Sequence, residues 1–191
     1  GKARLNTLLT LGTTTVEIKS GYGLDGANEI KMLEAAIQCA ANHAVDVVPT
    51  FLGAHALPKE YQGKSDEYVE LVVHEMLPMV REWWKKHPTM ERLFNDVFLE
   101  EGAFNWQQSR RILEAGINYG LLPKLHADEF TNMGGIRLAV DLGATSVDHL
   151  DEASEEDIEL LANSNTLAVV RTTANVLEFA SNSISSSEAS S

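Results

Sequence analysis

The chain has 191 residues, of which 44% are hydrophobic, and it carries a formal net charge of −13. This length allows one sizeable core but not three domains, and the acidic balance disfavours nucleic acid or an anionic membrane as a partner, since either needs a basic face. The lone Cys39 excludes an internal disulfide and is expected to be a buried thiol. No apolar run reaches the roughly 20 residues needed to cross a bilayer, and residues 1–10 lack the features of a signal peptide, so we expect a cytoplasmic protein.

Apolar, β-branched runs alternate with stretches of helical periodicity along most of the chain, after residues 2–11, which resemble the second half of a helix. Strands are predicted at residues 13–18, 45–52, 96–99, 121–125, 145–147 and 166–170. Helices are predicted at residues 28–41, 67–86 with a kink at Pro78, 105–120, 134–142 and 154–163. Asn105 with Gln108, and Ser154 with Asp157, have the spacing of capping pairs at helix starts.

Alternation of strands and helices is typical of βαβ units around a parallel sheet. No Gly-x-Gly-x-x-Gly follows a strand, so a (β/α)₈ barrel is favoured over a nucleotide-binding open sheet. About six of the eight strands are present, and such a barrel usually has about 250 residues. We therefore predict a partial barrel over residues 1–170 and a separate Ser-rich tail, residues 171–191, that is disordered.

Three histidines follow strand-like runs: His55, His126 and His149. The carboxyl ends of barrel strands converge on one mouth, where neutral imidazoles can hold a catalytic metal with one position open for water. Glu129 lies three residues after His126, so it could exchange a proton with that water. A single such histidine would more often be structural, and the three together favour function.

The first strand leads into Gly21-Tyr22-Gly23, which places a phenol hydroxyl at the mouth where it could contact a substrate, although a structural turn is an equal alternative. Glu100 and Glu101 follow the third strand and could line the same mouth, but we interpret them as carboxylates of a solvated loop.

Five segments together resemble the imidazolonepropionase family of the amidohydrolase superfamily. They are Gly12-Thr-Thr-Thr-Val-Glu-Ile-Lys-Ser-Gly-Tyr-Gly-Leu24, Thr50-Phe-Leu-Gly-Ala-His-Ala-Leu-Pro58, Glu101-Gly-Ala-Phe104, Lys124-Leu-His-Ala-Asp-Glu129 and Asp148-His-Leu150. Their order and spacing fit the family from about Lys2 to Val170, and the combination is specific whereas each segment alone is weak.

The resemblance implies a hydrolase that opens the ring of 4-imidazolone-5-propanoate to N-formimino-L-glutamate, using one zinc or iron ion to activate water. By motif, His126 resembles a metal ligand, Glu129 the residue that contacts substrate and moves the proton, and His149 the histidine that orients water or substrate. Tyr22 and His55 resemble substrate-binding residues. The resemblance leaves a homodimer open.

The family's His-x-His pair and its aspartate after the eighth strand have no counterpart in this chain. We therefore expect the chain alone to be an incomplete barrel without hydrolase activity. Two alternatives stay open. One is another amidohydrolase, such as a deaminase of a heterocycle, and the other is a non-catalytic fragment or binding module that lacks the metal.

Overall fold

The computed structural model describes residues 1–41 and 43–170, and it contains one sheet of six parallel strands in the order β1-β2-β3-β4-β5-β6. The strands are β1 (Thr15–Lys19), β2 (Asp46–Ala54), β3 (Phe94–Leu99), β4 (Leu122–Ala127), β5 (Ser146–His149) and β6 (Leu167–Val169). Each strand pairs with the next one along the chain. Sequential order is the winding of a (β/α)₈ barrel and not of a nucleotide-binding sheet, whose order reverses at a switch point. The predicted partial barrel is confirmed.

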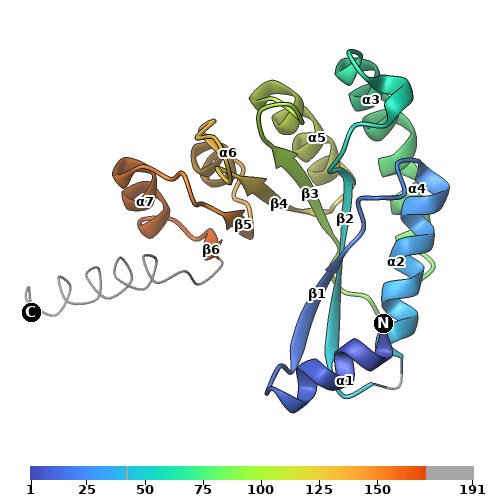
Figure 1. Cartoon of the computed structure of the whole chain (residues 1–191). Coiled ribbons are helices and arrows are strands. Elements are labelled where there is room, and N and C mark those ends of the chain that lie inside the picture. Colours follow the sequence, from blue (N-terminus) through green and yellow to red (C-terminus); the bar gives the residue numbers. More distant parts are fainter. Residues whose placement is uncertain (42, 171–191) are drawn as a thin grey trace, which may run out of the picture.

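Helices fill the connections between strands, and Figure 1 shows the strands curving into a trough with the larger helices along its outside. The helical segments are α1 (Lys2–Thr10), α2 (Gly26–Ala40), a short 3₁₀ turn (Lys59–Tyr61), α3 (Ser65–Leu71), α4 (Leu77–Trp84), α5 (Trp106–Asn118), α6 (Gly135–Asp141) and α7 (Glu155–Ala162). All predicted elements within the described residues are present, most within a few residues of their expected bounds. None of the described helices has the length and apolarity needed to span a membrane.

The long helix predicted at residues 67–86 is interrupted. A π-helical segment, Val72–Met76, separates α3 from α4 and ends just before Pro78, whose ring nitrogen cannot donate the hydrogen bond that a regular helix requires. The irregularity therefore lies on the amino-terminal side of the proline.

Cys39 of α2 is half-buried and not fully buried as predicted.

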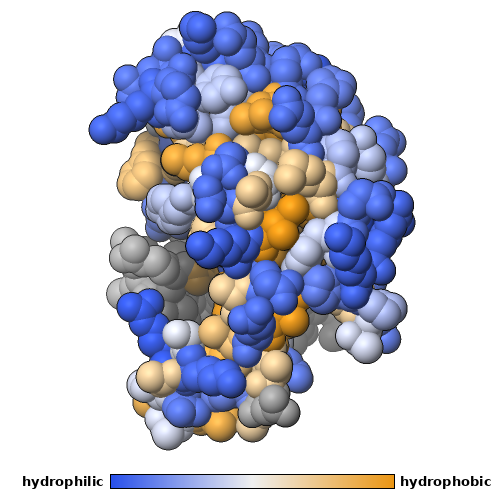
Figure 2. Space-filling view, turned by 90° about the vertical axis from the view of Figure 1, so that its right-hand side faces the viewer, coloured by the Kyte–Doolittle hydropathy of each residue, from blue (hydrophilic) through white to orange (hydrophobic). Residues whose placement is uncertain are grey.

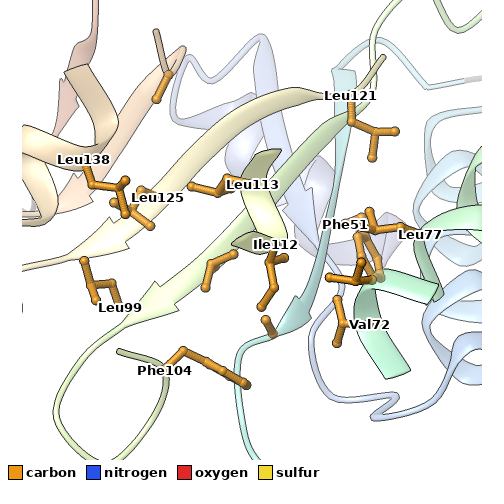
Figure 3. Packing of buried hydrophobic residues seen from close by; sticks show 14 of the residues in the cluster. Phe51, Val72, Leu77, Leu99, Phe104, Ile112, Leu113, Leu121, Leu125 and Leu138 are labelled. Carbon is orange, nitrogen blue, oxygen red and sulfur yellow. The ribbon is translucent and has the colours of Figure 1, made fainter. Parts of the chain in front are cut away.

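The core lies between the outer face of the sheet and the helices. Figure 3 shows Leu125 near Leu138 at one end of this core and Phe51 near Leu77 and Val72 at the other, with Ile112 and Leu113 of α5 between them. Burial of such side chains contributes roughly 1.5–3 kcal/mol each relative to exposure. Figure 2, which faces the side on which α2 and α4 lie in Figure 1, shows hydrophilic surface interrupted by a band of hydrophobic residues.

Two helices begin with complete capping boxes, as their spacing predicted. The Asn105 side chain accepts from the Gln108 N–H while the Gln108 side chain accepts from the Asn105 N–H, and Ser154 and Asp157 form the same pair at α7. The domain boundary predicted at residue 170 lies at the end of the described residues, and the tail for which disorder was predicted lies outside them.

We expect Asn105→Ala to lower the free energy of unfolding by about 1 kcal/mol, because the first turn of α5 loses its side-chain acceptor. Urea denaturation followed by circular dichroism measures the change. Gln107→Ala, at an exposed position of the same turn, is the control. Equal urea midpoints for the two variants would contradict the capping role of Asn105.

Candidate active site

The concave face of the sheet is polar, in contrast to the branched apolar residues that usually fill a barrel of this kind. Side chains alternate between the two faces of a strand, so the positions next to the outward Leu125 point inward. The charged or polar residues on this face are Glu17, Lys19, Thr50, Asp96, Lys124, His126, Ser146 and Asp148, and most of them are buried. This face carries two lysines and three carboxylates, so one further positive charge would balance it.

Lys19 of β1 bridges two carboxylates across this face. Its Nζ lies 2.6 Å from Asp96 Oδ2 and 2.5 Å from Asp148 Oδ2. Burial alone would lower the Lys19 pKa, but the Asp96, Asp148 and Glu17 carboxylates raise it to about 12. Burial alone would raise the Asp96 pKa, but the His126 imidazole and the Lys19 ammonium hold it well below its usual value. Both groups are therefore ionised at neutral pH.

His126 lies on β4 next to this ion pair, with its side chain 12% exposed. Its Nδ1 is 2.8 Å from Asp96 Oδ2 but makes no hydrogen bond of acceptable geometry. The carboxylate lies on the Nδ1 side of the ring, which leaves Nε2 as the nitrogen that could bind a metal.

The donors around His126 fit a divalent ion only in part. Asp96, His126 and Asp148 offer one nitrogen and two oxygens within 4.8 Å of one another, a set that suits zinc or iron. Lys19 already forms ion pairs with both carboxylates. His126 is therefore the donor of this group that remains available to a metal.

His55 follows β2 directly, beyond a bulge where the pairing with β3 shifts between Phe51 and Ala54. Bulges re-aim side chains at the rim of a sheet. The His55 ring centroid is 6.1 Å from that of His126 and 4.8 Å from that of Tyr22, which meets it edge-on. Burial lowers the His55 pKa, and so does the nearby His126, so a neutral ring is favoured.

Glu129 and His149 meet on the other side of His126. His149 ends β5, its ring centroid is 5.1 Å from that of His126, and its Nδ1 is 3.5 Å from Glu129 Oε1. His149 has a φ of +83°, an uncommon conformation for a non-glycine residue that tends to persist at functional sites. The pair forms one polar wall of the mouth.

A cavity of about 540 Å³ opens at this end of the sheet. Its lining includes His55, Phe98, Glu100 and Phe130. The Phe98 ring lies 5.6 Å from the His55 ring and 6.4 Å from the His126 ring, so it gives the site an apolar wall. Of the three strand-end histidines only His55 lines the cavity, so the cavity adjoins the group around His126 and does not enclose it.

The structure brings together all five residues that the sequence singled out: Tyr22, His55, His126, Glu129 and His149. Of the other histidines, His74 lies elsewhere, on the surface beside Glu70.

Other site residues were missed. Three signals in the sequence could have been used. Asp148 directly precedes His149, Lys19 directly follows the first predicted strand, and Asp96 begins the third. The interpretation of Glu100 as a solvated carboxylate is wrong, because it is 4% exposed.

Comparisons with known proteins find relatives that share one name. No protein-family model matches the chain. An imidazolonepropionase of Herpetosiphon aurantiacus is 53% identical over 169 residues, which are 88% of this chain and 40% of that protein. An imidazolonepropionase of Shewanella oneidensis is 49% identical over 172 residues, which are 89% of this chain and 40% of that protein. The chain thus spans about 40% of the length of the curated relatives it matches.

Solved structures share the fold at low sequence identity. Adenine deaminase from Arthrobacter aurescens superposes with a TM-score of 0.53 at 16% identity, covering 83% of this chain and 46% of its own. The ADAL–IMP complex gives 0.58 at 13% identity, covering 92% of this chain and 51% of its own. These likenesses concern the barrel alone.

We expect Lys19→Met to lower the free energy of unfolding by about 3–5 kcal/mol, because two buried carboxylates lose their cation. Urea denaturation at neutral pH measures the loss. Lys124→Met is the matched control, since its partner Glu17 is more exposed and keeps a hydrogen bond from Thr50. A control that loses as much stability as Lys19→Met would contradict the central role of Lys19.

In the metal-free chain, we expect the free energy of unfolding to be highest at intermediate pH and to fall at both acidic and alkaline pH. Asp96 has a lowered pKa when folded, so its contribution is present above the usual value of 3.8 and is lost as the pH falls. Lys19 has a raised pKa, so its contribution is present below 10.5 and is lost as the pH rises through about 12. Unfolding at about pH 3, 7 and 11.5 tests this. Higher stability at pH 3 than at pH 7 would exclude it.

Proposed function

We propose that this chain is part of an imidazolonepropionase, which opens the ring of 4-imidazolone-5-propanoate by hydrolysis to give N-formimino-L-glutamate. The observation that carries this proposal is the meeting of Tyr22, His55, His126, Glu129 and His149 at one end of the sheet, in segments that arrive from four different strands. Sequence identities near 50% to imidazolonepropionases support it. The cytoplasm as location and a homodimer as assembly remain predictions.

His126 would hold the metal, zinc or iron, together with donors from outside the described residues. The ion would supply electrophilic activation of water, which otherwise is a weak nucleophile at neutral pH. The Asp96 carboxylate beside Nδ1 would keep the His126 ring oriented for this task.

Glu129 would move the proton. Ring opening needs a base that takes a proton from the attacking water and then gives it to the departing ring nitrogen, and a carboxylate at the mouth can do both. His149, with Nδ1 3.5 Å from Glu129 Oε1, would orient the water or the substrate carbonyl and limit the positions that the carboxylate can take.

Tyr22 and His55 would bind the substrate. The Tyr22 side chain is exposed and its ring meets the His55 ring edge-on, so a phenol and an imidazole lie side by side. The Nδ1 atom of His55 is buried without a hydrogen-bond partner among the described residues, as expected of a group that awaits a polar ligand. Phe98 would pack against the planar ring of the substrate.

The activity test uses a chimera in which the matched part of this chain replaces the homologous 169-residue segment of the Herpetosiphon aurantiacus relative. We expect the chimera to hydrolyse imidazolonepropanoate, and we expect Glu129→Gln to lower kcat by about 10²–10⁴-fold, because the proton carrier is lost. Glu152→Gln, at an exposed position near His149, should leave kcat unchanged.

Three results would reject the proposal. They are a folded, metal-loaded chimera without turnover, full activity of Glu129→Gln, and preferential deamination of a heterocycle such as adenine. The last result would favour the deaminase alternative. The 191-residue chain, assayed in parallel, should show no turnover on its own.

A further inference from the structure

The loop that carries Glu129 is held by a buried carboxylate from a different strand. Glu100 follows β3 and is 4% exposed. Its Oε2 accepts hydrogen bonds from the Phe130 N–H at 3.0 Å and the Thr131 N–H at 3.3 Å, the two amides directly after Glu129. Its Oε1 accepts from the Glu101 N–H at 2.8 Å.

Glu100 makes no ion pair within residues 1–41 and 43–170, so its buried charge is balanced by peptide dipoles. Burial alone would raise its pKa, but the Phe130, Glu101 and Thr131 amides hold the pKa below its usual value. Three donors satisfy a carboxylate that would otherwise be costly to bury. The hydrogen bonds are therefore a structural requirement of this position and not a surface contact.

Asp128 holds the same loop from the other side of Glu129. It is fully buried, and its carboxylate accepts from the Met133, Gly135 and Ile136 amides. Its φ of +54° turns the chain sharply at the end of β4. Glu129 thus lies between a residue fixed by its own side chain and a peptide fixed by Glu100.

We propose that Glu100 is a positioning residue for Glu129. It fixes the peptide that links residues 129 and 130 and thereby keeps the Glu129 carboxylate beside His149. Glu100 lines the cavity, but both of its oxygens are engaged by backbone amides, so it acts through Glu129 and does not take part in proton transfer. The proposal rests on the role given to Glu129 under the proposed function.

Hydrogen exchange in the complete 191-residue chain tests the contact without any assay of activity. Glu100→Gln keeps the shape of the side chain but turns one acceptor oxygen into a donor, which opposes the N–H groups around it. We expect the Phe130 and Thr131 amides to exchange at least about tenfold faster, while the Met133 and Ile136 amides, held by Asp128, keep their rates. Glu91→Gln, at an exposed position before the same strand, is the control.

Kinetics of the chimera test the consequence. We expect Glu100→Gln to lower kcat about tenfold or more with KM within about twofold, because a misplaced base slows proton transfer more than it weakens binding. Glu91→Gln should match the parent. If Glu100→Gln does not fold, Glu100→Asp keeps the charge but shortens the reach, and the same two measurements apply.

Unchanged exchange at Phe130 and Thr131, or faster exchange with unchanged kcat, would overturn the positioning role while leaving the proposed function intact. The expected fall in kcat, if accompanied by faster exchange at the Met133 and Ile136 amides, would indicate that the whole loop has become more mobile. That result would also overturn the positioning role of Glu100. Failure of the proposed function is recognised separately, because the unsubstituted chimera would then be inactive.

Discussion

The ammonium of Lys19, placed between Asp96 and Asp148, is the interaction on which the concave face depends. It links β1, β3 and β5, so strands that are not neighbours in the sheet are joined across the trough. A barrel interior normally gains stability from branched apolar side chains. Here the hydrophobic core lies on the helix side of the sheet, and the inner face can therefore hold charges, provided that they are paired. The polar interior, in turn, is what allows His126 to lie beside a buried carboxylate.

At the rim of the sheet, buried carboxylates accept hydrogen bonds from backbone amides of the loops that carry site residues. Glu29, fully buried in α2, accepts from the Gly21, Gly23 and Leu24 amides and so holds the turn that presents Tyr22. Glu100 and Asp128 act similarly on the loop of Glu129. Catalytic groups need placement to within a fraction of an ångström, and loops alone rarely supply it. Because hydrogen bonds to buried carboxylates hold their peptides, these loops are positioned nearly as firmly as the strands that they follow.

Much of the fold could be predicted from the sequence, because strand and helix periods and the capping pairs at Asn105 and Ser154 are local signals. The strand-end histidines could be found for the same reason. Glu29 and Glu100 could not, since an acidic residue in the first turn of a helix or after a strand is usually solvated. Their burial depends on which amides the folded chain places around them, and that information is not local. The inward charges Lys19 and Asp96 required knowledge of which face of the sheet carries the core.

The positions of the site residues constrain how a substrate could lie. His55 and Tyr22 stand on one side of His126, while Glu129 and His149 stand on the other. Under the proposed function, a small ring that touches both groups at once would extend over His126, beside Phe98. His126 would then hold the metal next to the bond to be hydrolysed, and Glu129 would lie near the departing nitrogen. This arrangement follows from the order of the strands, because Tyr22 and His55 follow β1 and β2, whereas Glu129 and His149 come from β4 and β5.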